Sequence, residues 1–341
     1  MVLAIGRRCL QDREFRDEIR QELDFLARKP PVSMGTRRQS PYVITQLDRR
    51  EQRGDLGFSP LFISSRFRSG STLLWSMLRT MPKWTAFYEP LNPRCWFDPA
   101  RRGDWVDSTH RRIPDYWAEY EDLDIDRMRS LWSSSWDRVD LLLQSDSYEP
   151  DLHAYLSAII SHSDQCVCLQ FNRVDFRLTW LRESFPGSRI VHLIRNPRDQ
   201  WCSTYQQTDP PNHSANLLDL ERSDEFYLRI WAEDLQRTFP ALQLWPNAHP
   251  YQLSYAIWQL SYSYGFSNRD FEIRYEDLVQ QPRSVVESMM IATGHQVAEQ
   301  WQPPAVDDRS VGRWMRYADD NWFCEREQEV DEFLDRYVFE N

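Results

Sequence analysis

The chain has 341 residues, which is long enough to bury a sizeable core, and its formal net charge is −11. This acidic balance argues against a nucleic-acid-binding surface, so any site for a polyanion must be a local cluster of basic residues. No apolar run approaches the ~20 residues of a membrane span, and the first apolar residues are too few for a signal peptide. The six cysteines have no metal-ligand spacing, so we expect free thiols in a cytoplasmic protein.

The predicted elements alternate between strands and helices, which is typical of an α/β protein. Residues 1–57 are expected to form an N-terminal helical extension and linker, because Pro30 and Pro31 stop a helical stretch. Residues 58–341 are expected to form one domain with helical insertions at about 95–165 and 207–248. Strands are predicted over 60–66, 84–89, 167–172, 190–194 and 271–275, and helices over 71–81, over 249–264 and from Pro282 onward.

The first predicted strand runs into a turn rich in serine and glycine, Arg68-Ser69-Gly70-Ser71-Thr72-Leu73, which opens an amphipathic helix. In this arrangement, backbone N–H groups and the positive end of the helix dipole converge on one anionic group. The arginine, serine and threonine side chains add further donors. The turn does not match a Walker A loop, because Ser71 stands where the lysine would be and the cationic Arg68 precedes the glycine. A nucleotide kinase is therefore disfavoured.

A second motif of the phosphate-binding type follows the strand predicted over 190–194. Arg195 ends this strand, and Ser203 lies eight residues later, about two turns into the next element. Both side chains are expected to face one phosphate in the crevice at the carboxyl ends of parallel strands. Two such motifs on two strands indicate a nucleotide with phosphates at both ends of its sugar.

These motifs resemble those of the sulfotransferases that use 3′-phosphoadenosine-5′-phosphosulfate (PAPS). The turn at 68–73 resembles their 5′-phosphosulfate loop in its carbohydrate and protein-tyrosine form, and Arg195 with Ser203 has the spacing of their 3′-phosphate pair. The stretch 271–278 resembles their Tyr-Glu-Asp-Leu strand end, and 310–314 resembles the C-terminal loop that closes over PAPS. The resemblance covers roughly residues 58–315. It implies a P-loop NTPase-like three-layer fold with a central parallel sheet of about five strands and helical insertions.

The resemblance also implies which residues bind PAPS, and it implies that no metal is needed, since arginines and loop amides neutralise the sulfonate. Arg68 is expected to stabilise the charge that develops on the leaving phosphate. Adenine stacking must come from elsewhere than the loop, because Leu73 replaces the tryptophan of the smaller cytosolic members, and Trp75 is expected to be core. The implied nucleotide-binding residues are Arg68, Ser69, Gly70, Ser71, Thr72, Leu73, Arg195, Ser203, Tyr275, Gly312, Arg313 and Trp314.

Glu89, at the end of the second predicted strand, is the candidate base. Small-molecule sulfotransferases use a histidine, and none of the seven histidines lies in a comparable motif. Glu89 follows Arg68 by 21 residues, a spacing that resembles the catalytic glutamate of protein-tyrosine sulfotransferases. A carboxylate in a cleft accepts a hydroxyl proton when partial burial raises its pKa. The alternative is a structural glutamate paired with an arginine.

The resemblance thus implies a PAPS-dependent sulfotransferase that acts by in-line attack on the hydroxyl group of a small-molecule or carbohydrate acceptor. We expect no nucleic-acid partner and no membrane span. A nucleotide kinase and a catalytically silent nucleotide-binding module remain alternatives, whereas the absence of a Gly-x-Ser-x-Gly elbow excludes that type of serine hydrolase.

Several other residues have two interpretations each. Asn172 and Arg173 are expected to face the crevice, against either nucleotide or acceptor. Arg198 either helps Arg195 to bind the phosphate or pairs with an acid instead. The tryptophans of the 95–165 insertion line an acceptor site or form the core of a small subdomain. His192 is expected to be a core residue of its strand.

Overall fold

The structure is a computed structural model that describes residues 60–110, 113–205, 209–217, 226–240, 242, 248–306 and 310–339. The N-terminal extension predicted for residues 1–57 lies outside the described residues, as do parts of the 207–248 insertion. Within the described residues, no helix has the length and apolar character needed to cross a membrane. The five cysteines that the structure describes are free thiols.

All five predicted strands form one parallel sheet, which confirms the predicted central sheet. Its centre is β1, which pairs with β3 on one side and with β4 on the other, so that Leu61 lies opposite both Cys168 and Arg189. Because β1 is covered on both faces and both edges, every residue of it is buried. The sheet order is β2 (Trp84–Tyr88), β3 (Cys166–Phe171), β1 (Leu61–Ser65), β4 (Arg189–Ile194) and β5 (Phe271–Arg274).

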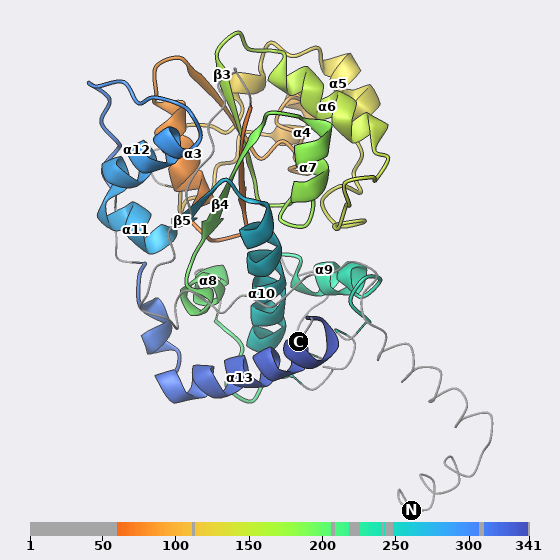
Figure 1. Ribbon diagram of the computed structural model, residues 1–341, viewed down its shortest axis with the longest axis vertical. Helices are drawn as coiled ribbons and strands as arrows, with labels where there is room; N and C mark the ends of the chain where they lie inside the picture. The colour runs from red at the N-terminus through yellow and green to blue at the C-terminus, as the bar shows by residue number, and fades with distance from the viewer. Residues whose placement is uncertain are drawn as a thin grey trace, which may run out of the picture.

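Helices cover both faces of the sheet and make the three layers of a P-loop-like α/β fold (Figure 1). This arrangement follows from strands that are apolar on both sides and need cover on each. One face is covered by α3 (Ser71–Arg79), α11 (Tyr275–Gln280) and α12 (Pro282–Ala292), and the other by α6 (Pro150–Ile160), α7 (Leu178–Ser184) and α10 (Pro250–Asn268).

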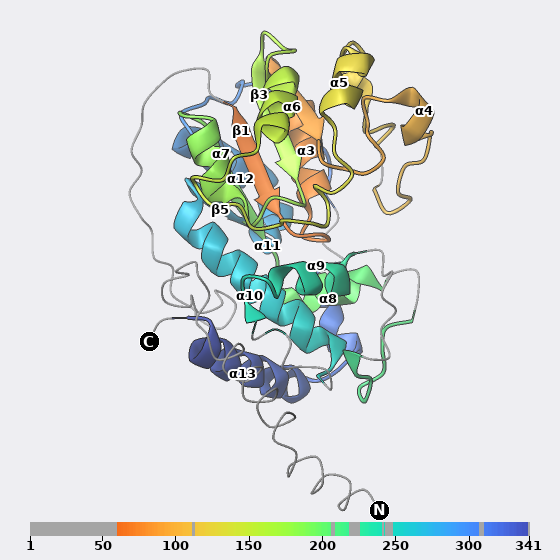
Figure 2. The same cartoon turned by 90° about the vertical axis from the view of Figure 1, so that its right-hand side faces the viewer.

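A further group of helices lies beyond the carboxyl ends of the strands (Figure 2). The first of them, α8, follows the end of β4 directly, because Asn196 caps its N-terminus and Pro197 occupies its first turn. These elements enclose the end of the sheet where the predicted motifs lie. They are α8 (Pro197–Thr204), α9 (Leu228–Leu235), the 3₁₀ helix η4 (Arg313–Arg316) and α13 (Asp320–Tyr337).

The tryptophan-rich insertion is helical, as predicted, and most of its described tryptophans belong to a core. Trp96 and Trp136 are buried, and the Trp136 ring lies 5.3 Å from that of Tyr155 in an aromatic cluster that includes Trp132. Trp105 is the exception, since half of its surface is exposed. The elements of this insertion are α4 (Pro99–Arg102), η1 (Ala118–Tyr120), α5 (Ile125–Leu131) and α6.

Two predicted boundaries differ from the structure at positions that matter for the site. Glu89 was placed in the second strand, but β2 ends at Tyr88 and Glu89 turns the chain with a φ of 39°. Tyr275 is the first residue of α11 and not the end of β5, because Glu276 and Asp277 favour the N-terminus of a helix. His192 is buried in β4, as predicted, and it lies so close to Gly265 that a Cβ there would approach its ring to 2.4 Å.

Candidate functional site

The turn between β1 and α3 presents an open helix N-terminus. Gly70 caps α3 with a φ of 93°, and a Cβ at this position would lie 2.2 Å from the ring of Tyr275, so only glycine fits. No side chain in the described part of the chain caps α3, and the first turn of this helix contains no acidic residue. The backbone N–H groups of this nine-residue helix are therefore oriented to receive an anion.

Arg68 connects this turn with α8. Its Nε donates to the Oγ atom of Ser203 at 3.1 Å, so the structure brings together the two predicted motifs, which are 135 residues apart. Its only ion pair in the described chain is a long one, with the carboxylate of Asp107 at 3.6 Å. Burial lowers the pKa of Arg68, and the charges of Arg195 and Arg313 add to this effect, while Asp107 opposes it.

Arg195 lies at the centre of the predicted nucleotide site and is almost completely buried. Its guanidinium donates to the carbonyl oxygens of Arg68 at 2.9 Å and of Ser310 at 2.8 Å, and it lies 4.5 Å from the centre of the Tyr275 ring. Its Nε has no hydrogen-bond partner, and no carboxylate in the described part of the chain forms an ion pair with it. The Tyr275 hydroxyl in turn contacts Ser310 Oγ at 2.6 Å. Four predicted segments therefore meet at this arginine.

The C-terminal segment is fixed to α8 by Asp199. This carboxylate accepts hydrogen bonds from the backbone N–H groups of Gly312 at 2.7 Å and Trp314 at 3.1 Å. Arg198 pairs with Glu327 of α13 at 2.8 Å, which supports the interpretation of Arg198 as the partner of an acid. The Trp314 ring lies 4.8 Å from the Arg198 guanidinium and therefore packs toward α13.

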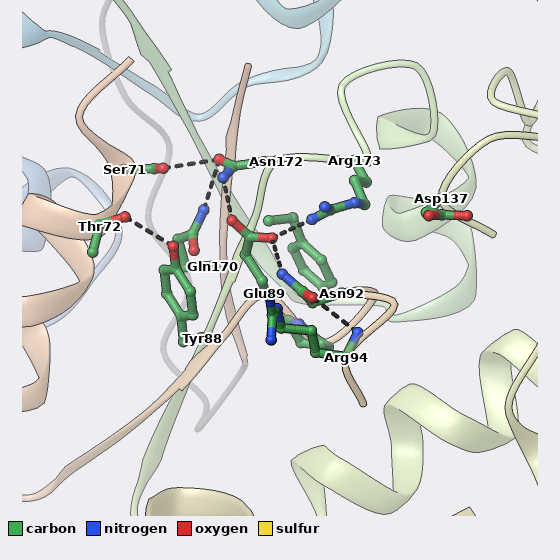
Figure 3. A network of polar contacts seen from close by, with 12 residues as sticks. Ser71, Thr72, Tyr88, Glu89, Asn92, Arg94, Asp137, Gln170, Asn172 and Arg173 are labelled. Atoms are coloured by element: carbon green, nitrogen blue, oxygen red, sulfur yellow. Dashed lines mark hydrogen bonds and ion pairs between the residues drawn. The ribbon is translucent and has the colours of Figure 1, made fainter. Parts of the chain in front are cut away.

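Glu89 forms the centre of a buried polar network on the other side of β1 (Figure 3). One carboxylate oxygen, Oε1, accepts a hydrogen bond from Asn172 Nδ2. The other, Oε2, forms an ion pair with Arg173 and accepts a hydrogen bond from Asn92 at 2.9 Å. Burial opposes the charge of Arg173, but the carboxylate of Glu89 outweighs this effect and raises the pKa of Arg173. Glu89 is thus paired with an arginine, the alternative that the sequence left open.

Asn172 joins Glu89 to the phosphate-type turn. Its Oδ1 accepts hydrogen bonds from Ser65 Oγ at 2.8 Å, from Ser71 Oγ at 2.8 Å and from the Gln170 side chain at 3.0 Å. Figure 3 shows this chain of contacts running from the start of α3 to the carboxylate. The candidate base and the turn are therefore parts of one network.

His110 also belongs to the site, although no motif in the sequence indicates it. Its Nε2 lies 3.3 Å from Thr72 Oγ1, and its Nδ1 contacts the hydroxyl of Tyr116. Burial lowers the pKa of His110, so the imidazole is neutral near pH 7 and has a nitrogen that accepts protons. His110 lies 38 residues beyond Thr72 in an insertion without a motif, and only the fold brings the two together.

The side chains of two predicted residues, Ser69 and Leu73, point elsewhere. Ser69 Oγ donates to the carbonyl oxygen of Arg66 at 2.7 Å and stabilises the turn itself. Leu73 packs against the apolar core, and Trp75 is fully buried, as predicted, with its Nε1 donating to Ala86. Arg313 lines a cavity of about 400 Å³ beside α8 together with Cys202, Tyr205, Pro210, Arg316 and Tyr317.

Comparisons with known proteins give one family. Residues 60–299 match a family model described as the sulfotransferase family, whereas no curated protein sequence matches significantly. The sulfotransferase domain of the Synechococcus PCC 7002 olefin synthase is similar in structure, with 17% identity and a TM-score of 0.40 over 84% of this chain and 98% of that chain. The sulfotransferase domain from the curacin biosynthetic pathway has 15% identity and a TM-score of 0.44 over 82% and 98%. A sulfotransferase from Alicyclobacillus acidocaldarius has 15% identity and a TM-score of 0.40 over 81% and 93%.

Proposed function

Because the chain belongs to the sulfotransferase family, we propose that it transfers a sulfuryl group from PAPS to the hydroxyl group of a carbohydrate or other small acceptor. The observation that carries this proposal is Arg195, a buried cation that donates only to backbone carbonyl oxygens among the described residues. A buried charge without a counter-charge is costly, so an anion bound here stabilises the protein. The free thiols of the described cysteines support a cytoplasmic location.

The residues around Arg195 fit a nucleotide with phosphates at both ends of its sugar. In this proposal Arg195, Ser203 and Ser310 hold the 3′-phosphate, and the N-terminus of α3 with Arg68 holds the 5′-phosphosulfate. Tyr275 contacts the nucleoside, and the segment from Gly312 to Trp314 closes the site. Arginines and loop amides neutralise the sulfonate, so the proposal includes no metal.

Glu89 is the proposed base, and its hydrogen bonds indicate which of its two carboxylate oxygens accepts the proton. Oε2 already accepts from two donors, Arg173 and Asn92, whereas among the described residues Oε1 accepts only from Asn172 and keeps a lone pair. The acceptor oxygen attacks sulfur and forms the new O–S bond while the bond from sulfur to the 5′-phosphate oxygen breaks. The electron pair leaves with 3′,5′-phosphoadenosine, and the hydroxyl proton passes to Oε1.

The first experiment is a thermal-shift titration of the full chain with 3′,5′-phosphoadenosine, ATP and AMP. A ligand at about 100 times its Kd stabilises the folded state by about 2.7 kcal/mol, which gives a clear rise in Tm. We expect a rise that is selective for the bisphosphate, because only this nucleotide fills both anion sites. An equal rise with ATP, or none with any nucleotide, contradicts the proposed donor site.

The base is tested by comparing Glu89→Gln with His110→Asn in a sulfuryl-transfer assay. We expect Glu89→Gln to lower kcat by at least about 100-fold, the usual lower limit for a general base, while the Kd for the bisphosphate changes less than about threefold. His110→Asn is expected to lower kcat by less than about tenfold. If the order of the two effects is reversed, His110 is the base and Glu89 is structural.

A further inference from the structure

We propose that Asn172 is a positioning residue for sulfuryl transfer, whose side-chain amide orients the Glu89 carboxylate and couples it to the phosphate-binding turn. This inference rests on the proposed role of Glu89 as the base. Asn172 does not touch the reacting atoms in this proposal. It acts through the two groups that it joins, the carboxylate on one side and the start of α3 on the other.

The hydrogen-bond partners fix the orientation of the Asn172 amide. Its Oδ1 accepts from the hydroxyl groups of Ser65 and Ser71 and from Gln170, and its Nδ2 donates to Glu89. A reversed amide would place its oxygen against the Glu89 carboxylate and its NH₂ group against the Gln170 NH₂ group. Because Asn172 is also buried, water cannot compensate for either repulsion. The carboxylate oxygen that keeps a lone pair is therefore the one that Asn172 holds.

The Asn172 amide accepts a hydrogen bond from Ser71, a residue that also belongs to the predicted anion site. Ser71 is the first residue of α3, and its single hydroxyl proton goes to Asn172 Oδ1 at 2.8 Å. An anion bound at the N-terminus of α3 competes for this proton. Binding of an anion at this turn therefore changes the strength of the hydrogen bond that Asn172 Oδ1 accepts from Ser71. The Asn172 amide transmits this change to Glu89 through the hydrogen bond that Nδ2 donates. Arg173, the residue after Asn172, forms an ion pair with the second carboxylate oxygen of Glu89, Oε2.

An amide suits this position better than a carboxylate. An aspartate here has no N–H to donate and would place a second negative charge against Glu89. Two carboxylates in contact cannot both ionise freely, so the pair takes up a proton at a higher pH than Glu89 alone. The other titratable groups on which the charge of Glu89 acts include Arg173, His110, Tyr88, Tyr116 and Tyr120.

The test measures kcat, KM for PAPS and the pH profile of kcat for Asn172→Ala and Asn172→Asp in the full chain. We expect Asn172→Ala to lower kcat by about 10- to 100-fold, since a base misplaced by about 1 Å loses this much. KM for PAPS is expected to change less than about threefold. Asn172→Asp is expected to move the acidic limb of the kcat profile upward by about one pH unit or more.

The control is Ser65→Ala, which removes one donor to the same Oδ1 but leaves the bond to Glu89 in place. We expect its kcat to stay within about threefold of wild type, and the Tm rise with 3′,5′-phosphoadenosine reports whether each variant is folded. If Asn172→Ala does not fold, Asn172→Ser takes its place, with the same expected loss. A folded variant with unchanged kcat, together with an unmoved acidic limb in Asn172→Asp, overturns the inference.

A double-mutant cycle separates this inference from the proposed function. If Asn172 acts through Glu89, then Asn172→Ala lowers kcat by less than about threefold in a Glu89→Gln background. A full and additive loss in that background shows that Asn172 acts elsewhere and overturns the inference alone. If Glu89→Gln itself keeps more than a tenth of the wild-type kcat, the proposed base is wrong and the inference is overturned with it.

Discussion

The arginines on the two sides of β1 are compensated in different ways. On the side of β2 and β3, Arg173 pairs with Glu89 and Arg66 pairs with Asp175 at 3.0 Å, and these side chains are largely buried. On the side of β4 and β5, Arg195 is as deeply buried but donates to two backbone carbonyl oxygens. Carboxylates therefore neutralise Arg66 and Arg173, whereas no carboxylate among the described residues pairs with Arg195.

This difference teaches that the partners of the basic residues, and not their number, indicate where an anion binds. A buried ion pair leaves little electrostatic attraction for an external ligand, because the internal carboxylate already neutralises the charge of the arginine. A buried arginine with carbonyl partners keeps its full charge for a ligand. In a protein with a net charge of −11, this contrast supports the proposal that a polyanionic nucleotide binds on the side of Arg195.

The most direct test of this difference is to remove one arginine from each side of β1. Arg195→Ala is expected to weaken binding of 3′,5′-phosphoadenosine by about 100-fold or more, because a charged partner of a buried anion contributes about 2–5 kcal/mol. Arg66→Gln is expected to leave this affinity within about threefold. It should instead lower the free energy of unfolding by about 3 kcal/mol, since Asp175 is left buried without its partner.

Isothermal titration gives the two affinities, and urea unfolding without ligand gives the two stabilities. We expect Arg195→Ala to lose affinity for the nucleotide and Arg66→Gln to lose stability. If both variants lose nucleotide affinity to the same extent, the two sides of β1 do not differ in the way described here.

His192 extends the same principle to stability, since it is a buried group in β4 without a counter-charge. Burial, with the positive charge of Arg269 adding to it, lowers the pKa of His192 to about 3. Because the folded pKa lies below the unfolded value of about 6.5, its contribution is fully present above pH 6.5 and is lost as the pH falls toward 3. Between pH 7.5 and 5 we expect the wild type to lose about 2 kcal/mol of unfolding free energy through this group.

Urea unfolding of wild type and His192→Gln at several pH values isolates this contribution, because the other buried histidines are common to both proteins. The stability of the variant should fall by about 2 kcal/mol less over this range. Equal slopes for the two proteins would show that His192 is not an uncompensated group.

The smallest expected effect concerns Arg68, which is intermediate between the two sides. Its only carboxylate partner in the described chain is Asp107 at 3.6 Å, and both side chains are partly exposed. We expect Asp107→Asn to tighten binding of 3′,5′-phosphoadenosine by about two- to fivefold, the size of a weak, partly solvated ion pair. Unchanged or weaker binding in an isothermal titration would place Arg68 with the fully compensated arginines.

The sequence was sufficient for the sheet and for the strand-end motifs, because both depend on short stretches. Segments of four to six residues that are rich in apolar side chains predict the five strands, and the turn after β1 shows its own helix start and glycine. The helix start at Tyr275 was missed by the sequence analysis, which ended a strand there, although Glu276 and Asp277 stand in the first turn of α11.

The rest of the candidate site depends on contacts between distant residues. His110 approaches Thr72 only because the insertion folds back over the start of α3. Asn172 meets Ser71 across 101 residues, and Arg198 meets Glu327 across 129 residues. No local propensity or periodicity reports such pairs, so the sequence left Glu89 and Arg198 with two interpretations each.

The central position of β1 also has a consequence for the synthesis of the chain. Leu61 pairs with Cys168 and Arg189, so both neighbours of β1 are translated more than 100 residues after it. At roughly 5–20 residues per second, a ribosome needs on the order of ten seconds to add them. During this time the apolar residues Leu61, Phe62 and Ile63 have no strand beside them. The sheet can therefore close around β1 only after β4 has emerged, and until then the exposed apolar residues favour aggregation of the nascent chain.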